Sequence, residues 1–292
     1  MKVKYILLIL ALLCTASISY GQLAQRISAL QNEEGRFVPP SKKELDQAES
    51  LFTRTMSWEE LLALKRAWAS IEMDCQSIEI ANKNGYLVYE KPGCQRGRGI
   101  FLFLKSESKV FLQAPHSFFD RGTGKIVSLL LVEDDFGGAC WNSVPRYALG
   151  HYKGPADTQA HMANYFVAFA RAFAKTKKNS YLVQLHGFGA HKRKSEAGKA
   201  AGAIISSGTG KPGFYLRTLV ASMKVQFPKP IRLYPHEVQE LGATRNVSGK
   251  TLRQYNHPGF VHIEFSGKLR QRLLAEKGMR SKLSRRLLRF LN

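Results

Sequence analysis

The sequence lacks an apolar run long enough to cross a bilayer, which takes about 20 consecutive apolar residues. The apolar run Ile6–Cys14 is much shorter; it follows Lys2 and Lys4 and precedes the small, polar segment Ser17–Gly21. This order of a basic, an apolar and a small-residue region predicts a secretory signal that is cleaved near Gly21. We therefore expect an exported protein, in the periplasm or outside the cell.

Cysteine is also scarce, with four cysteines in 292 residues. Cys14 would leave with the signal, and the spacing of Cys75, Cys94 and Cys140 contains no C-x-x-C pair, which argues against a structural zinc knuckle. In an oxidising compartment the simplest expectation is one disulfide and one leftover thiol. Cys75 and Cys94 are the more local pair and therefore the expected bridge.

Acidic residues are few: 22 Asp and Glu stand against 44 Lys and Arg, which gives a net charge of +22. Loss of Lys2 and Lys4 with the signal would leave 22 − 2 = +20. A charge of this size implies an anionic partner or surface. Acidic peptides, γ-glutamyl polymers and cell-wall fragments are the candidates, because export would remove the protein from nucleic acid.

No repeat period or low-complexity tract is present, and removal of residues 1–21 leaves 292 − 21 = 271 residues. This length suits one α/β domain covering residues 22–292. Within residues 22–75, Ser41 with Glu44 and Ser57 with Glu60 have the spacing of helix capping boxes. We expect an N-terminal helical layer there.

The middle of the chain alternates between strand and helix patterns. Apolar runs bounded by Gly and Pro predict strands at Ser77–Ala81, Tyr86–Tyr89, Gly99–Leu104, Val110–Gln113 and Ile126–Val132. Asp157–Ala174 has apolar residues at helical spacing, and a strand ending on His186 follows. The alternation predicts an α/β fold with a mixed, mostly parallel central sheet and helices on both faces.

The C-terminal segment, residues 268–292, alternates Leu with Lys and Arg at helical spacing. The ordinary interpretation is a solvated basic helix that packs on the domain through its leucines. Binding of an anionic membrane or glycan surface is the functional alternative.

Three predicted strands end on residues that can bind a metal or a proton: His116 with Asp120, then His186, then Glu264. In open α/β sheets the ligand site lies beyond the carboxyl ends of the strands, so these side chains suggest one shared site. Two histidines and one carboxylate are a usual ligand set for catalytic Zn²⁺. His116, Asp120 and His186 fit that set, and Glu264 is then the expected general base.

Three further residues are candidates for substrate contact. His161 is expected in the first turn of the helix that begins at Asp157, where it would face the site or act as a surface cap. His191 follows His186 by five residues and lines the same mouth or belongs to an exposed basic loop. Arg121 either contacts substrate or neutralises Asp120.

The order of these motifs resembles the zinc carboxypeptidase-like superfamily, and more closely its N-formylglutamate amidohydrolase and poly-γ-glutamate hydrolase branches. The resemblance covers about residues 97–275 and rests on Ala114-Pro-His116-Ser, Asn142-x-x-x-Arg146, Leu185-His186-Gly and His262-Ile-Glu264-x-Ser266. It implies zinc ligation by His116 and His186, with Glu264 as the base. It also implies that Arg146 holds a substrate carboxylate or polarises the scissile carbonyl, with Asn142 beside it as a further contact with substrate.

One position departs from the family pattern. The usual first motif is His-x-x-Glu, but Phe119 stands three residues after His116. The carboxylate ligand must then be Asp120 or lie elsewhere. The obvious substitutes follow the run Ile126–Val132; they are Glu133, Asp134 and Asp135.

Other catalytic classes fit poorly. Ser207-Gly-Thr-Gly-Lys211 lacks the first glycine of a phosphate-binding loop, since Ile205 stands at that position. No G-x-S-x-G elbow of a serine hydrolase is present. The sequence therefore favours an exported zinc hydrolase that cleaves an amide bond next to a carboxylate, in acyl-glutamate, γ-glutamyl or wall-peptide substrates. The alternative is a non-enzymatic secreted binder of anionic polymer or membrane surface.

Overall fold

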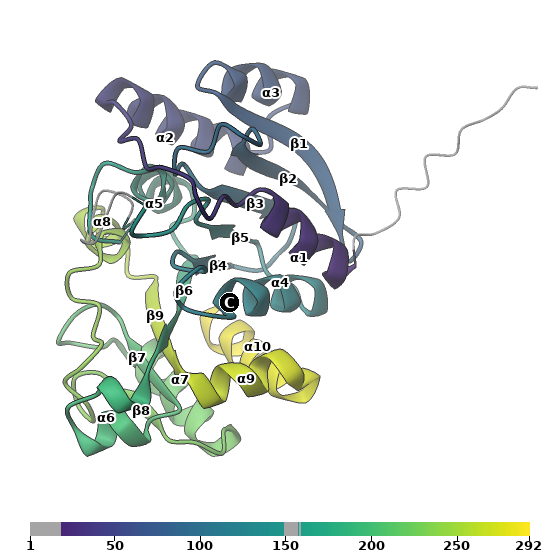
Figure 1. The fold of residues 1–292 in the computed structure, drawn as a ribbon. Helices are drawn as coiled ribbons and strands as arrows, with labels where there is room; N and C mark the ends of the chain where they lie inside the picture. Colours follow the sequence, from purple (N-terminus) through teal and green to yellow (C-terminus); the bar gives the residue numbers. More distant parts are fainter. Residues whose placement is uncertain (1–18, 149–156, 158) are drawn as a thin grey trace, which may run out of the picture.

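The computed structural model describes residues 19–148, 157 and 159–292 (Figure 1). The predicted secretory signal therefore lies outside the described residues, apart from its last three positions. Helix α1 already begins at Tyr20, and its first buried side chain, Leu23, comes after the predicted cleavage position. Among the described residues, no helix has both the length and the apolar character needed to span a bilayer.

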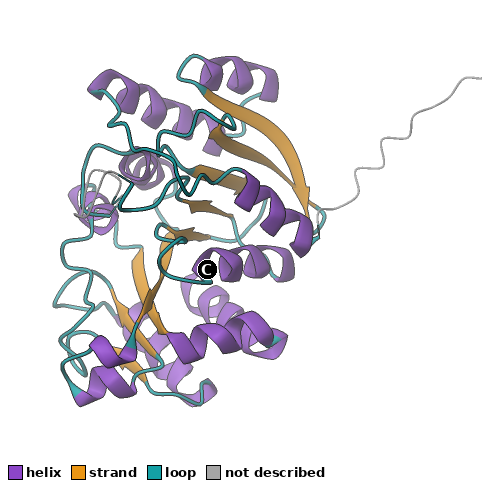
Figure 2. Ribbon diagram, viewed as in Figure 1, coloured by secondary structure: helices purple, strands orange, loops and turns teal. Residues whose placement is uncertain are grey.

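A nine-stranded sheet forms the centre of the molecule, in the order β1-β2-β3-β5-β4-β6-β9-β7-β8 (Figure 2). The strands are β1 (Met73–Ile80), β2 (Lys83–Glu90), β3 (Ile100–Leu104), β4 (Val110–Ala114), β5 (Gly138–Trp141), β6 (Tyr181–Phe188), β7 (Ala203–Ser206), β8 (Ile231–Leu233) and β9 (Phe260–Ser266).

Helices cover both faces of this sheet. They are α1 (Tyr20–Ala29), α2 (Lys42–Met56), α3 (Leu61–Ala69), α4 (Thr123–Glu133), α5 (Tyr165–Thr176), α6 (Glu196–Ala200), α7 (Phe214–Gln226), α8 (Val247–Gln254), α9 (Gly267–Ala275) and α10 (Lys277–Leu291), with a short 3-10 turn at Ala190–Lys192.

The four central strands β5, β4, β6 and β9 are parallel to one another. Antiparallel pairings join β5 to β3 on one side of this group and β9 to β7 on the other. The predicted mixed α/β sheet with helices on both faces is confirmed. Parallel pairings make up half of the pairs rather than most of them. The parallel centre places the carboxyl ends of β4, β6 and β9 at one edge.

Alternation of side chains along the strands divides the core into two parts, one on each face. On one face α1, α4, α7, α9 and α10 pack against β-strand residues such as Leu112 and Leu185. On the other face α2, α3, α5 and α8 enclose an aromatic cluster around Phe52, which contacts the rings of Trp68, Phe101 and Phe169.

The N-terminal segment is helical as predicted, but its helices divide between the two faces. Leu23 and Ile27 of α1 pack in the core that contains α4, whereas Phe52 of α2 and Trp68 of α3 pack in the core that contains α5. The segment also ends earlier than predicted, because β1 begins at Met73.

The strand predicted at Ile126–Val132 is wrong: these residues lie within helix α4. A short, uninterrupted apolar run does not distinguish a buried strand from a helix buried on all sides. Helix α4 is of the second kind over most of this run, since it contacts α1, α9, α10 and the central strands, and Ile126–Leu131 are all buried.

Two helix boundaries also differ from the sequence prediction. Helix α5 begins at Tyr165 rather than Asp157, because the Asn164 side chain accepts a hydrogen bond from the backbone N–H of Val167 and caps the helix there. The predicted single C-terminal helix is two helices, α9 and α10. Its leucines pack as expected, with Leu269 and Leu283 fully buried.

The expected disulfide is absent. Cys75, Cys94 and Cys140 are free thiols, and Cys75 is buried while Cys94 is exposed. Cys75 lies inside the core that contains α2 and α3, because its position on β1 faces inward.

Candidate metal centre

Strand register brings the predicted site residues together. β6 pairs with β9 in parallel so that His186 lies opposite Glu264 and Gln184 lies opposite His262. β4 pairs with β6 on its other side, and His116 follows β4 by two residues. His116, His186 and Glu264 therefore lie on or just after three adjacent strands at one edge of the sheet, where the sequence predicted that they would converge.

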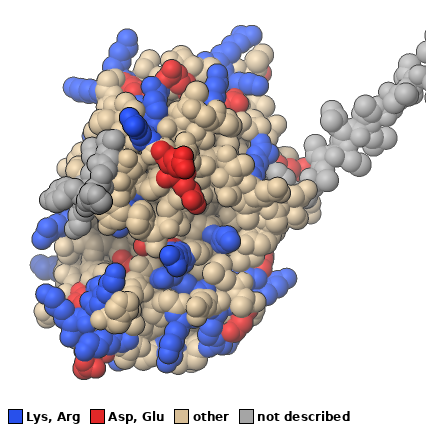
Figure 3. Space-filling model, in the orientation of Figure 1, with Lys and Arg blue, Asp and Glu red and all other residues tan. Residues whose placement is uncertain are grey.

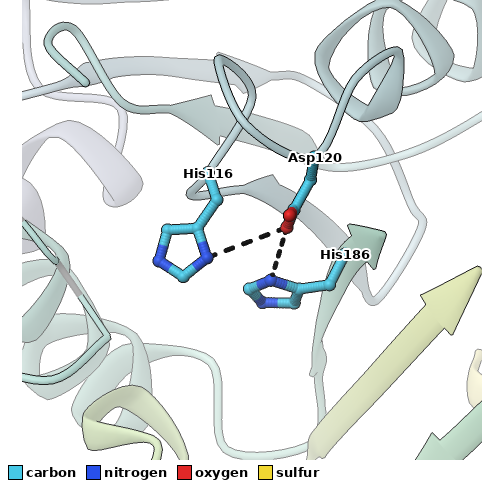
Figure 4. A group of neighbouring side chains, drawn as sticks. All are labelled: His116, Asp120 and His186. Atoms are coloured by element: carbon cyan, nitrogen blue, oxygen red, sulfur yellow. Dashed lines mark hydrogen bonds and ion pairs between the residues drawn. The ribbon is translucent and has the colours of Figure 1, made fainter. Parts of the chain in front are cut away.

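His116, Asp120 and His186 form a compact group (Figure 4). The Nδ1 atom of His186 is 3.0 Å from Asp120 Oδ2, and the Nδ1 atom of His116 is 3.7 Å from the same oxygen. All three residues are buried, and one ligand atom from each lies within 4.8 Å of the others. Two imidazole nitrogens and a carboxylate oxygen therefore converge on one small volume.

The ring nitrogens on the far side of both histidines have partners of their own. His116 Nε2 lies 2.9 Å from Asp157 Oδ1. The Nε2–H group therefore donates a hydrogen bond to that carboxylate, and the unprotonated Nδ1 atom faces Asp120. His186 Nε2 lies 3.3 Å from the side-chain oxygen of Gln184. Outer partners of this kind fix the orientation and tautomer of metal-ligating histidines.

The inner side of the group is held together by the hydrogen bond between His186 and Asp120. Burial alone would lower the pKa of His186, but the hydrogen bond and the charge of Asp120, together with the charge of Glu264, outweigh burial and raise the pKa. Burial would raise the pKa of Asp120, yet the hydrogen bond and the charge of His186 hold that pKa below its usual value. The two side chains therefore stabilise each other's charged forms.

His116 behaves differently from His186. Burial lowers the pKa of His116, and the hydrogen bond to Asp157 only partly offsets this effect. For Asp157, burial is outweighed by the hydrogen bond from His116 and the charge of Arg146, so the pKa of Asp157 lies well below its usual value. Asp157 is therefore a fixed negative charge that orients a neutral His116.

Glu264 and His262 complete the buried polar cluster. Together with His186 they form a second group whose ligand atoms lie within 4.8 Å of one another. Glu264 Oε2 and His262 Nδ1 are buried without a hydrogen-bond partner. Burial raises the pKa of Glu264 to about 7 and lowers the pKa of His262 well below its usual value.

These observations test whether the residues fit a metal ion. Unpartnered buried polar atoms are costly, and those of Glu264 and His262 lie next to His186. The donor set of two histidines and one carboxylate, with outer hydrogen bonds to Asp157 and Gln184, is that of a catalytic zinc site. The residues fit such an ion.

Arg146 reaches this group from the segment after β5. Its Nη1 lies 3.3 Å from His116 Nδ1, and its Nη2 donates to Asp157. Its Nε is buried without a partner, and the guanidinium lies over the Tyr147 ring. The Arg146 guanidinium therefore lies next to the candidate metal-binding group.

Asn142 contacts the loop that follows β4 and carries His116. Its side-chain oxygen accepts hydrogen bonds from the backbone N–H of Ser117, at 3.0 Å, and from the Ser117 hydroxyl, at 2.7 Å. Its amide nitrogen donates to the Val144 carbonyl. Both the oxygen and the nitrogen of the Asn142 side chain therefore have partners within the protein. Asn142 holds the loop that carries His116, whereas the sequence predicted that it would contact substrate.

The three other predicted contact residues lie outside the metal-binding group. Arg121 is exposed and directly follows Asp120 at the start of α4. His161 precedes α5, and its carbonyl accepts a hydrogen bond from the Asn164 side chain. His191 is exposed in the turn after β6. None of them joins the groups formed by the described histidines and carboxylates.

The structure separates the carboxylates that the sequence offered as alternatives for the third ligand. Glu133 pairs with Arg280 at the far end of α4, with 2.6 Å between Glu133 Oε1 and Arg280 Nη2. Asp135 pairs with Lys83, and Asp134 caps the same end of the helix. Asp120 is the carboxylate that lies beside both histidines.

Sequence reasoning missed three members of the cluster. His262 belongs to a motif that carried the family resemblance, and its period-two spacing from Glu264 places both side chains on one face of β9. Gln184 has the same spacing from His186 on β6. Asp157 was predicted only as the start of a helix, and no pattern in the sequence marked it as a partner of His116.

Comparisons with known proteins identify no close relative. No family model and no curated protein match the sequence. Among solved structures, the zinc-free form of YndL is 14% identical, with 75% of this chain and 89% of that chain covered and a TM-score of 0.40. A gene product from Agrobacterium tumefaciens is 15% identical, with coverage of 64% and 90% and a TM-score of 0.40. A candidate metallopeptidase from Shewanella amazonensis SB2B is 11% identical, with coverage of 78% and 93% and a TM-score of 0.36. At these identities and TM-scores the likeness is distant and assigns no function.

Proposed function

We propose that this protein is an exported zinc-dependent hydrolase that cleaves an amide bond next to a carboxylate. The observation that carries the proposal is the convergence of His116, Asp120 and His186, whose ligand atoms lie within 4.8 Å of one another. Residues far apart in the chain supply this group, and Glu264 adjoins it through the register of β6 and β9.

His116 and His186 would hold the ion through their Nδ1 atoms and Asp120 through its carboxylate. When bound, a zinc ion lowers the pKa of a water molecule to about 7 and polarises a carbonyl oxygen. Asp157 keeps the His116 Nε2 proton in place, which leaves Nδ1 as the ligand atom. Gln184 supports His186 in the same way.

Glu264 is the proposed general base. Its Oε2 atom has no hydrogen-bond partner, so it is free to accept the proton of an attacking water and to return it to the leaving nitrogen. Glu264 is buried beside His186, and its pKa of about 7 lies near neutral pH, where a carboxylate serves well in proton transfer.

Arg146 is the proposed holder of a substrate carboxylate. Its guanidinium already donates to one carboxylate, Asp157, and its Nη1 borders the metal-binding histidines. Arg favours carboxylates because its planar group donates two parallel hydrogen bonds. A substrate carboxylate at this position would lie beside the proposed metal ligand His116.

The net charge of +22 supports an acidic substrate. Long-range attraction raises the concentration of an anionic ligand at a basic surface, and added salt screens this effect. Acyl-glutamates, γ-glutamyl polymers and acidic wall peptides have the required amide bond next to a carboxylate.

A substrate screen on the metal-loaded protein tests the proposal. We expect hydrolysis of N-acyl-glutamate or γ-glutamyl substrates, loss of hydrolysis on chelation, and recovery on addition of Zn²⁺. An uncharged amide of the same length serves as the control. Salt-sensitive binding of anionic polymer with neither bound metal nor hydrolysis would instead identify a non-enzymatic binder.

A further inference from the structure

The three helices α7, α9 and α10 contain no acidic residue, although they contain eleven Lys and Arg residues. All three cover the same face of the sheet, and α10 contacts both α7 and α9. Figure 3 shows Lys and Arg side chains gathered over the lower half of the visible face, the half in which these helices lie in Figure 1. The charge of the protein is therefore concentrated partly on this helical layer.

Few of these basic side chains are neutralised within the protein. Among the described residues, three of the eleven form an ion pair: Arg280 with Glu133, Arg272 with Glu276, and Lys224 with Glu237. No carboxylate oxygen of the described acidic residues lies within the 4.0 Å of an ion pair from the other eight. An excess of positive charge of this kind attracts an anionic partner.

The exposed side of α10 is basic. Lys282, Arg285 and Arg289 follow one another at intervals of three and four residues, so they lie on one side of the helix. None of the three is buried, whereas Leu283 and Leu287 on the inner side pack in the core. Helix α10 thus presents a row of cations to solvent.

Helix α7 exposes two large apolar side chains. Phe214 is 77% exposed and Val225 is 83% exposed. They are eleven residues apart, which is about three turns at 3.6 residues per turn, so both lie on one side of the helix. Arg217 lies between them in the sequence and is also exposed. Exposed apolar side chains bordered by polar ones are typical of surfaces that bind a membrane or another protein.

The exposed sides of α7 and α10 form one surface, because the two helices contact each other on the same face of the sheet. We call it the α7–α10 surface. Its residues are Phe214, Arg217, Val225, Lys282, Arg285 and Arg289. None of them belongs to the candidate metal-binding groups, which lie at the carboxyl ends of the central strands.

We propose that the α7–α10 surface binds an anionic lipid membrane. Its Lys and Arg side chains contact the phosphate groups of the lipid headgroups, and Phe214 and Val225 enter the layer between headgroups and acyl chains. A soluble anionic polymer would pair with the cations but would leave the two apolar side chains in water. The exposed apolar side chains of α7 therefore favour a membrane. This binding is independent of the proposed hydrolysis, since neither the metal ligands nor Glu264 take part.

Sedimentation of the full chain with lipid vesicles tests the proposal. We expect binding to vesicles that contain phosphatidylglycerol, weaker binding to vesicles of phosphatidylcholine alone, and a loss of affinity on addition of salt. The triple variant Lys282→Gln, Arg285→Gln, Arg289→Gln should bind phosphatidylglycerol vesicles about a hundredfold more weakly, because each basic residue near such a surface contributes about fivefold. Equal affinity for the two kinds of vesicle, or no binding to either, would overturn the proposal.

A matched triple variant controls for the loss of charge. Lys42→Gln, Lys43→Gln, Arg66→Gln removes three exposed cations from α2 and α3, which cover the other face of the sheet. It should bind phosphatidylglycerol vesicles with close to the wild-type affinity. Equal losses in the two triple variants would show that net charge alone drives binding and would overturn the assignment to the α7–α10 surface.

Substitution of the apolar residues separates a membrane from a soluble polymer. The double variant Phe214→Gln, Val225→Gln should weaken binding to phosphatidylglycerol vesicles about tenfold, because two apolar side chains no longer leave water. Its affinity for heparin, a soluble anionic polymer, should stay at the wild-type value. Leu62→Gln, which replaces an exposed apolar residue of α3, should leave vesicle binding unchanged. Vesicle binding that is insensitive to loss of Phe214 and Val225 would overturn the membrane assignment and identify a polymer-binding surface instead.

Discussion

His186 and Glu264 lie opposite each other on the adjacent parallel strands β6 and β9. One residue is a proposed metal ligand and the other the proposed base, so a single strand pairing fixes their separation. Rigid strands hold a catalytic arrangement more accurately than loops do. The order of the sheet therefore accounts for the proximity on which the proposed chemistry depends.

Substitution of Glu264 by Gln distinguishes a base from a ligand. If Glu264 is the base, hydrolysis should fall about a hundredfold to ten-thousandfold, because proton transfer contributes factors of this size. Metal content should stay at the wild-type level, as measured by elemental analysis of the purified variant. Loss of the metal together with activity would show that Glu264 is a ligand, as its proximity to His186 and His262 would also allow.

Substitution of Asp157 by Asn should weaken metal binding. The charge that orients His116 is removed, and loss of such an outer partner typically lowers metal affinity about tenfold to a hundredfold. Competition with a chelator of known affinity gives the dissociation constant. The matched control is Asp46→Asn, an exposed carboxylate on α2. Equal affinities in the two variants would contradict the role of Asp157.

Metal affinity should depend on pH with a defined sign. A proton and a metal ion compete for Nδ1 of His186. The pKa of this residue is raised above 6.5 in the metal-free protein, because the hydrogen bond and charge of Asp120 together with the charge of Glu264 outweigh burial. As pH falls through that raised pKa, the proton displaces the metal and affinity decreases. Chelator competition between about pH 6 and pH 8 measures the effect around the reference pKa of histidine. An affinity that is constant over this range would contradict the assignment of His186.

The three thiols should differ in reactivity. Cys94 is exposed, whereas burial raises the pKa of Cys75 to about 12 and raises that of Cys140 further above its usual value. A thiol reagent should therefore label Cys94 in the folded protein and should reach Cys75 and Cys140 only after denaturation. Mass spectrometry of the oxidised protein that detects a Cys75–Cys94 bridge would contradict this arrangement of the core.

Sequence alone predicted which side chains would lie close together, because the candidate residues stand at the ends of strands. His116, Asp120, His186 and Glu264 each follow or end an apolar run, and parallel strands bring such positions to one edge. Asp157 could not be identified in this way, since it follows no apolar run and its contact with His116 joins residues 41 positions apart. The sequence also did not predict the role of Asn142, because only the fold shows that its side-chain oxygen accepts a hydrogen bond from the Ser117 hydroxyl.

The fold was harder to predict where burial is uniform. The run Ile126–Val132 has no polar face to reveal a helical period, so the sequence favoured a strand where α4 stands. The start of α5 depended on which polar residue caps the helix, and Asn164 does so rather than Asp157. In contrast, the amphipathic leucine pattern of α9 and α10 predicted their packing correctly.

Metal bound per chain, measured by elemental analysis, addresses the central claim. The wild-type protein loaded with Zn²⁺ and then freed of excess ion should retain about one zinc per chain, as expected for a single catalytic site. His186→Ala should lose both the zinc and the hydrolytic activity, while Lys42→Gln should keep both. Full zinc content in His186→Ala, or no zinc in the wild type, would contradict the account.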